Sequence, residues 1–74
     1  MMIKFKANDY KKGDIIRIFR ECEDMTQKEF GREISKSRET IKHYESSEVN
    51  YTIETLLKIA DRFGYDIYIQ KTKK

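Results

Sequence analysis

The polar side chains best suited to chemistry in this 74-residue sequence are gathered in one short stretch. Arg38 and Glu39 stand together, and Lys42 and His43 follow about one helical turn later. A guanidinium group can donate two hydrogen bonds to O6 and N7 of guanine, and a carboxylate can accept one from N4 of cytosine. Taken alone, such charged residues more often form a solvated helix face. The surrounding sequence must therefore show whether these side chains recognise a ligand or simply face the solvent.

Catalysis and metal binding find no support in the residue types. His43 is the only histidine and Cys22 the only cysteine, so neither a disulfide nor a tetrahedral metal site can form within one chain. His43 has no second histidine or nucleophile at a motif spacing, which argues against a catalytic base. We therefore expect no enzymatic activity, no cofactor and no metal, and we expect Cys22 to be a small buried apolar residue.

Length and charge restrict the class of protein. A chain this short buries one core, so we expect a single domain over residues 1–74 with its core at 9–64. The absence of an apolar run of roughly 20 residues and of a signal peptide predicts a cytoplasmic protein with no membrane partner. A net charge of +3 and a pI near 9.0 favour nucleic acid as the partner. Residues 26–50 nevertheless hold five basic and five acidic side chains, so the case depends on pattern.

The N-terminal part of the chain predicts a strand followed by a helix. Residues 2–6 alternate apolar and basic side chains with the period of a short strand. Asn8 or Asp9 can then cap a helix that runs to about Cys22. Its buried face would carry Ile15, Ile16, Phe19 and Cys22.

The middle of the chain predicts two short helices set at a steep angle. Thr26 and Glu29 have the spacing of a capping box, which predicts a helix over residues 26–34. The break falls at residues 35–36, and Ser37 can cap the next helix. The buried face of that helix would carry Ile41 and Tyr44.

The last part of the chain predicts a fourth helix and a second strand. Thr52 can cap the helix, and Gly64 stands where a left-handed C-terminal cap is expected. Residues 65–70 are rich in β-branched and aromatic side chains and alternate in polarity, which is typical of a strand. The apolar stripe of the helix would consist of Ile53, Leu56, Leu57, Ala60 and Phe63.

Three blocks of the sequence together resemble the Cro/C1 (XRE) family of helix-turn-helix regulators. They are residues 25–31 (Met-Thr-Gln-Lys-Glu-Phe-Gly), 37–45 (Ser-Arg-Glu-Thr-Ile-Lys-His-Tyr-Glu) and 52–60 (Thr-Ile-Glu-Thr-Leu-Leu-Lys-Ile-Ala). Their common order and spacing extend the resemblance over roughly residues 13–64. The resemblance implies a mainly α, lambda-repressor-like helix-turn-helix bundle of four to five helices, with short N- and C-terminal β-strands.

The resemblance also implies which residues contact double-stranded DNA. In the family, the N-terminal end of the third helix enters the major groove, which here assigns base contacts to Arg38, Glu39 and His43 and favours a half-site containing C/G. Arg20 and Glu45 match a family ion pair that ties the first helix to this recognition helix. Contacts to the DNA backbone are implied for Gln27, Thr40, Lys42, Ser46, Ser47, Asn50 and Tyr51.

Several positions depart from the family pattern. Glycine is usual at Ser35, and a serine there would have to accept a positive φ at a cost of about 1 kcal/mol. Glu48 stands where a basic residue would help the contact to the DNA backbone, which predicts a modest and salt-dependent affinity. The other departures are Gly31 for alanine, Lys36 for a hydrophobic residue and Ser47 for glycine.

The C-terminal strand suggests how two chains would assemble. Some helix-turn-helix antitoxins end in a similar apolar strand that pairs across a dimer axis, which makes Tyr65, Ile67 and Ile69 the candidate dimer contacts. The strand at residues 2–6 could widen that sheet or pair within its own chain. A two-fold dimer would place two recognition helices about 34 Å apart on a pseudo-palindromic operator.

Two functions of different class follow from these observations. The first is a homodimeric, sequence-specific transcriptional repressor, Cro-like or antitoxin-like, that acts by occupying its operator. The second is a protein-interaction module, such as an antitoxin that mainly captures a cognate toxin or another protein partner. The equal numbers of acidic and basic side chains at residues 26–50 motivate the second.

Overall fold

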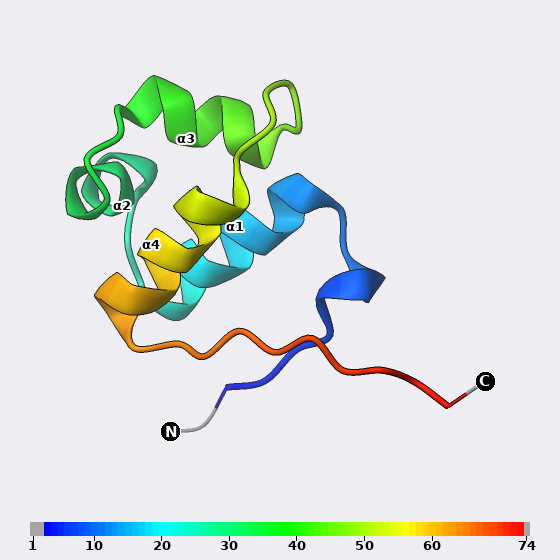
Figure 1. Ribbon diagram of the computed structural model, residues 1–74. Helices are drawn as coiled ribbons and strands as arrows, with labels where there is room; N and C mark the ends of the chain where they lie inside the picture. The colour runs from blue at the N-terminus through cyan, green and yellow to red at the C-terminus, as the bar shows by residue number, and fades with distance from the viewer. Residues whose placement is uncertain (1–2, 74) are drawn as a thin grey trace.

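The chain is built from short helices joined by tight turns, as described over residues 3–73 by a computed structural model. In Figure 1, α3 lies along one edge of the molecule, and the two terminal segments run along the opposite edge. The prediction of a mainly α bundle is confirmed. In chain order the elements are the 3-10 helix η1 (Ala7–Asp9) and the α-helices α1 (Lys12–Cys22), α2 (Gln27–Glu33), α3 (Arg38–Glu45) and α4 (Ile53–Phe63).

The helix caps predicted for the helix-turn-helix are present. The backbone N–H of Glu29 donates to Thr26 Oγ1 at 3.1 Å, and the N–H of Thr26 donates to Glu29 Oε1 at 2.9 Å, which completes the capping box. Ser37 Oγ accepts from the N–H of Thr40 at 3.1 Å and so begins α3. Between them Ser35 has a φ of 59°, the left-handed conformation that the resemblance implied for this position. These local bonds fix where α2 and α3 begin.

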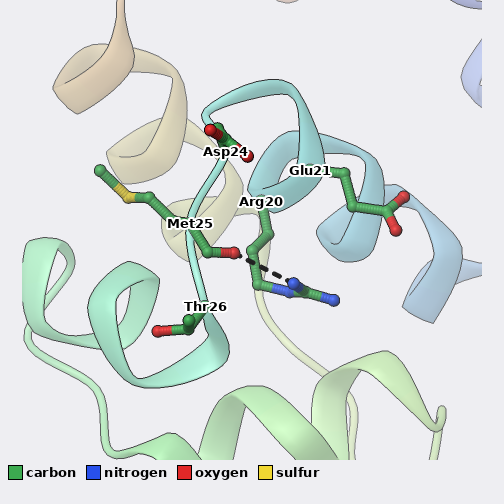
Figure 2. A pocket seen from close by; sticks show the side chains of 5 residues that line it. All are labelled: Arg20, Glu21, Asp24, Met25 and Thr26. Atoms are coloured by element: carbon green, nitrogen blue, oxygen red, sulfur yellow. Dashed lines mark hydrogen bonds between the residues drawn. The ribbon is translucent and has the colours of Figure 1, made fainter.

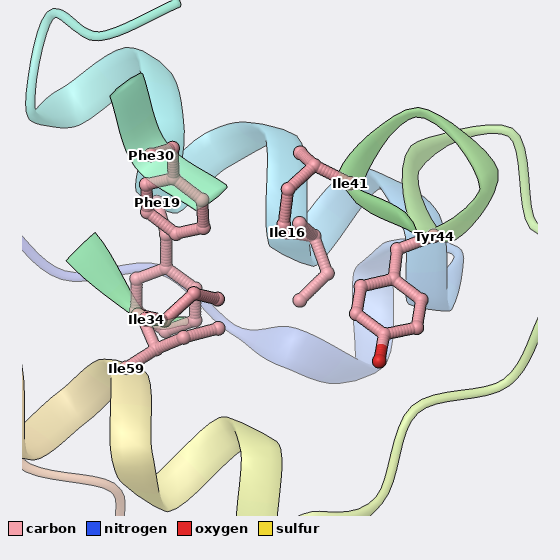
Figure 3. Packing of buried hydrophobic residues seen from close by; sticks show 7 residues of the cluster. All are labelled: Ile16, Phe19, Phe30, Ile34, Ile41, Tyr44 and Ile59. Carbon is pink, nitrogen blue, oxygen red and sulfur yellow. The ribbon is translucent and has the colours of Figure 1, made fainter. Parts of the chain in front are cut away.

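One apolar core lies between the four α-helices (Figure 3). Each of its large side chains is withdrawn from water, and full burial of such a side chain stabilises the fold by about 1.5–3 kcal/mol. Burial of α3 on this side leaves the opposite face of the same helix to solvent. The cluster consists of Ile16, Phe19, Phe30, Ile34, Ile41, Tyr44 and Ile59.

The first helix begins later than the capping residues suggested. Asn8 and Asp9 belong to η1, and α1 begins at Lys12 without a side-chain cap. Tyr10 between them is extended, with a φ of −127° and a ψ of 154°, which interrupts the helical path. The prediction for Cys22 was also wrong, since its side chain is exposed at the last turn of α1.

The buried face of α4 differs in part from the predicted stripe. Ile53 and Leu57 are 65% and 52% exposed, whereas Thr55 and Ile59 are buried. A helix turns by about 100° per residue, so the first pair lies roughly opposite the second. Apolar residues are common on both sides of α4, and contact with the other helices selects the buried one. Gly64 ends the helix with a φ of 81°, as predicted.

The two predicted terminal strands are absent from residues 3–73, and residue 2 lies outside the described part. Residues 65–70 contain no helix, and in the described chain no backbone hydrogen bond joins them to residues 3–6. Side chains connect the two segments instead, because the ring of Phe19 packs against the rings of Phe5 and Tyr65. The distances between ring centroids are 5.9 Å and 5.0 Å. A strand needs a second backbone as its partner, and within residues 3–73 neither segment is paired with one.

Candidate nucleic-acid interface

The outward face of α3 carries the predicted base-reading residues. Arg38 and Glu39 are exposed in the first turn, and the side chain of His43 is 43% exposed one turn later. Ile41 and Tyr44 on the inner face are 0% and 6% exposed, so burial fixes the rotation of the helix. The structure thus places Arg38, Glu39 and His43 where a groove about 12 Å wide could receive them.

Arg20 and Glu45 form a charge-assisted pair that anchors the C-terminal end of α3. Arg20 Nε donates to Glu45 Oε2 at 2.6 Å and Arg20 Nη2 donates to Glu45 Oε1 at 3.0 Å, with side chains 18% and 8% exposed. A third guanidinium nitrogen, Nη1, donates to the carbonyl oxygen of Met25 at 3.1 Å (Figure 2). The bond to Glu45 raises the pKa of Arg20. One guanidinium therefore connects α1, the start of the helix-turn-helix and the end of α3.

Gln27 belongs to the same network. Its Nε2 donates to Glu45 Oε1 at 3.4 Å, and its side chain is half-buried. A contact from Gln27 to a DNA phosphate would compete with this bond.

The loop residues assigned to the DNA backbone contact the protein itself. The hydroxyl of Tyr51 donates to the carbonyl oxygen of Lys12 at 2.6 Å, and burial raises the pKa of Tyr51. Asn50 Oδ1 accepts a hydrogen bond from the ammonium group of Lys12. Ser47 adopts a φ of 64°, and its Oγ lies so near Gly13 that a Cβ atom added there would stand 2.6 Å from it. These three residues tie the loop after α3 to the start of α1.

Thr40 and Lys42 differ in whether their polar groups are already engaged by other parts of the chain. Thr40 Oγ1 lies 2.9 Å from Ser37 Oγ and takes part in the cap of α3. Lys42 is exposed on the outer face. Of the residues proposed for the DNA backbone, Lys42 is the only one with a charged side chain, and its exposure leaves that charge accessible to a phosphate.

Glu48 makes contacts that the sequence did not indicate. Its Oε2 lies 3.2 Å from His43 Nδ1, and its Oε1 lies 2.9 Å from the hydroxyl of Ser46. The Ser46 bond, followed by the nearby charge of His43, lowers the pKa of Glu48. The five-residue separation of Glu48 and His43 crosses the end of α3, so helical spacing could not reveal the pair. Ser46, Glu48 and His43 form one polar cluster at the end of the candidate interface.

The candidate dimer residues lie on the side of the molecule away from α3 (Figure 1). Tyr65 packs on Phe19, and its hydroxyl donates to Glu23 Oε2 at 2.7 Å. Burial and this bond raise the pKa of Tyr65. Ile67 and Ile69 are 38% and 99% exposed. Tyr65 is therefore part of the fold, while the following residues offer free apolar surface.

Residues 3–73 contain no group of three or more His, Cys, Asp or Glu side chains that could hold a metal ion. Within the same residues, no helix has the length and apolar character needed to cross a membrane.

Comparison with known proteins supports the arrangement found here. A protein-family model described as helix-turn-helix matches residues 16–69. The matched part includes α2, α3 and α4, the Arg20–Glu45 pair, and the cluster of Ser46, Glu48 and His43. No curated protein and no solved structure gave a significant match.

Proposed function

The chain belongs to the helix-turn-helix family, and on that premise we propose that it is a cytoplasmic, sequence-specific transcriptional repressor that binds a pseudo-palindromic operator as a homodimer. The family match indicates a DNA-binding regulator of the Cro/C1 (XRE) type. The observation that carries the finer proposal is the exposed polar face of α3, which burial on one side and the Arg20–Glu45 pair at one end hold in a fixed orientation.

The proposed mechanism is occupation of the operator without catalysis. Arg38 donates two hydrogen bonds to guanine and Glu39 accepts one from cytosine, while Lys42 neutralises a phosphate. Because the helix is already fixed before DNA arrives, little conformational entropy is lost on binding. A repressor bound in this way excludes other proteins from the same stretch of DNA.

Arg38→Ala is expected to lower the affinity for a selected operator by about 5- to 150-fold, since one bidentate base contact contributes about 1–3 kcal/mol. Fluorescence anisotropy with DNA selected from a random pool by the purified protein measures the change. Arg38→Lys keeps the charge without the two-pronged geometry, and it should lose most of the base preference. Lys4→Ala removes a positive charge from an exposed position outside the helix-turn-helix and serves as the control. Equal losses for Arg38→Ala and Lys4→Ala would contradict base reading by Arg38.

We place the dimer contact at residues 65–70. Ile67 and Ile69 expose apolar side chains, and no backbone hydrogen bond joins these residues to the rest of the described chain beyond the N–H of Tyr65. Pairing with the same segment of a second chain would satisfy the backbone groups and bury both isoleucines. It would also leave both α3 helices free, since the segment lies along the opposite edge (Figure 1).

Ile69→Lys is expected to weaken the dimer at least about tenfold, because a charge would enter the contact and apolar burial would be lost. Ile69 is 99% exposed, so the fold of the single chain should be preserved. Sedimentation equilibrium over a range of concentrations reports the dissociation constant. Tyr68→Lys, at the neighbouring position that is 83% exposed, is the matched control. The dimer contact lies elsewhere if both variants sediment like the unaltered protein.

A second function, capture of a partner protein such as a toxin, is favoured by one observation. Tyr51, Asn50 and Ser47, all assigned to the DNA backbone, are engaged by α1. The dependence of DNA affinity on salt separates the two functions. A repressor should release several counterions, with a slope of about −0.9 per phosphate in log affinity against log salt, whereas a slope near zero favours the protein-interaction module.

A further inference from the structure

The loop after α3 folds back on the end of the helix and is held there by its backbone. The carbonyl oxygen of His43 accepts the N–H of Glu48 at 3.1 Å and that of Val49 at 3.4 Å. The hydroxyl of Ser46 lies 3.1 Å from the same oxygen and 2.9 Å from Glu48 Oε1. The placement of Glu48 therefore rests on several bonds and does not depend on a lone ion pair at the surface.

The carboxylate of Glu48 lies beside one ring nitrogen of His43. Glu48 Oε2 lies 3.2 Å from His43 Nδ1. The lowered pKa of Glu48 keeps its carboxylate ionised, and an ionised carboxylate only accepts hydrogen bonds. At this distance the carboxylate favours a hydrogen on Nδ1, and in that form the neutral ring carries its lone pair on Nε2. In residues 3–73 no hydrogen bond to Nε2 is present, which leaves this atom available to a ligand.

We propose that Glu48 is a positioning residue for base recognition, which holds His43 in the Nδ1–H form and makes Nε2 a hydrogen-bond acceptor toward DNA. The proposal rests on the proposed function of α3. In the major groove the amino groups of adenine and cytosine are donors, whereas guanine and the O4 of thymine present acceptors. Nε2 as an acceptor selects adenine or cytosine. Without Glu48, the ring is free to take the Nε2–H form and to donate to guanine.

This role differs from the effect expected of Glu48 as an isolated charge. An acidic residue beside DNA would lower affinity for all sequences alike, because its repulsion acts on the phosphates. A positioning residue changes the preferred base at one position and acts only through His43. The exposed pair contributes little to stability, so a purely structural role would have almost no effect on either readout.

The form of the ring can be observed without DNA. His43 is the only histidine, so long-range proton–nitrogen correlation spectra of 15N-labelled protein show a single imidazole ring. At pH 8, above the range in which histidine usually changes charge, we expect the Nδ1–H form to predominate. Glu48→Ala should shift the ring toward Nε2–H, and Glu48→Gln, whose side-chain carbonyl can still accept, should shift it less. Predominance of Nε2–H in the unaltered protein, or no change in Glu48→Ala, overturns the proposal.

Selection from a random DNA pool at pH 8 tests the consequence for recognition. The unaltered protein should prefer adenine or cytosine at the base position whose preference disappears in His43→Ala. Glu48→Ala should move that preference toward guanine by about fivefold or more, in keeping with the usual contribution of a base contact. The double variant should match His43→Ala, because Glu48 acts through His43. A guanine preference in the unaltered protein, or a shift that persists without His43, overturns the proposal.

The two experiments separate this inference from the function on which it rests. If no sequence is enriched by any of the proteins, the proposed DNA-binding function fails. The spectra then still decide whether Glu48 sets the form of the His43 ring. If DNA is bound with a clear preference and the spectra show Nε2–H, the function stands and the positioning role of Glu48 is wrong.

Discussion

Glu45→Ala should lower the free energy of unfolding by about 2–4 kcal/mol, somewhat less than the 3–5 kcal/mol typical of breaking a fully buried ion pair. Glu45 is 8% exposed and accepts from Arg20 Nε at 2.6 Å and from Nη2 at 3.0 Å. Its removal leaves the charge of Arg20, which is 18% exposed, without its main partner. Gln27 also loses its acceptor. Urea denaturation followed by circular dichroism measures the loss.

Two further variants show whether the unpaired charge is the cause. Asp61→Ala removes a carboxylate from an exposed position on α4 and should change stability by no more than about 0.5 kcal/mol. The double variant Arg20→Met with Glu45→Met removes both charges and retains apolar bulk, so it should recover much of the loss. If Glu45→Ala were as stable as Asp61→Ala, the pair would not hold α3 in place.

Gly13→Ala should destabilise the fold by about 1–3 kcal/mol, although alanine is the better helix former by about 0.5–1 kcal/mol. Gly13 lies in α1 where that helix crosses the end of α3. A Cβ atom there would stand 2.6 Å from the carbonyl oxygen of Tyr44 and in similar conflict with the carbonyl oxygen of Glu45. Backbone atoms cannot move aside as a flexible side chain can, so the two helices would have to separate. Chemical denaturation measures the change.

Gly64→Ala provides the comparison for Gly13→Ala. Gly64 has a φ of 81°, but no atom stands within 4 Å of the place where its Cβ would lie. The cost at this position is backbone strain alone, about 1 kcal/mol. Because Gly13→Ala separates α1 from α3, we also expect it to loosen the loop that Tyr51 and Ser47 tie to α1. A Gly13→Ala protein more stable than the unaltered one would show that the helices can part without loss.

The sequence was sufficient to predict the features that depend on residues close together in the chain. The capping box of Thr26 and Glu29, the cap at Ser37 and the left-handed Gly64 each depend on residues at most four positions apart. The left-handed φ of Ser35 was expected from the family resemblance, because glycine is usual at this position. Such interactions are repeated in every helix terminus, which is why spacing alone predicts them.

The sequence also predicted which face of α3 is buried, because Ile41 and Tyr44 are the apolar residues at helical spacing there. It failed for α4, where apolar residues occupy both sides and only contact with the other helices selects Ile59 over Ile53. It failed for the terminal strands as well. Alternating residues can form a strand only beside a second backbone, and propensity does not supply one.

The sequence by itself therefore determined the helix-turn-helix, its caps and the residues displayed on the outer face of α3. The tertiary structure alone decided which polar side chains of that region remain free. Tyr51 is separated from Lys12 by 39 positions, and Glu48 reaches His43 across the end of a helix. Whether a hydroxyl or carboxylate meets water, DNA or another part of the chain depends on where distant segments lie, and no local spacing encodes that distance.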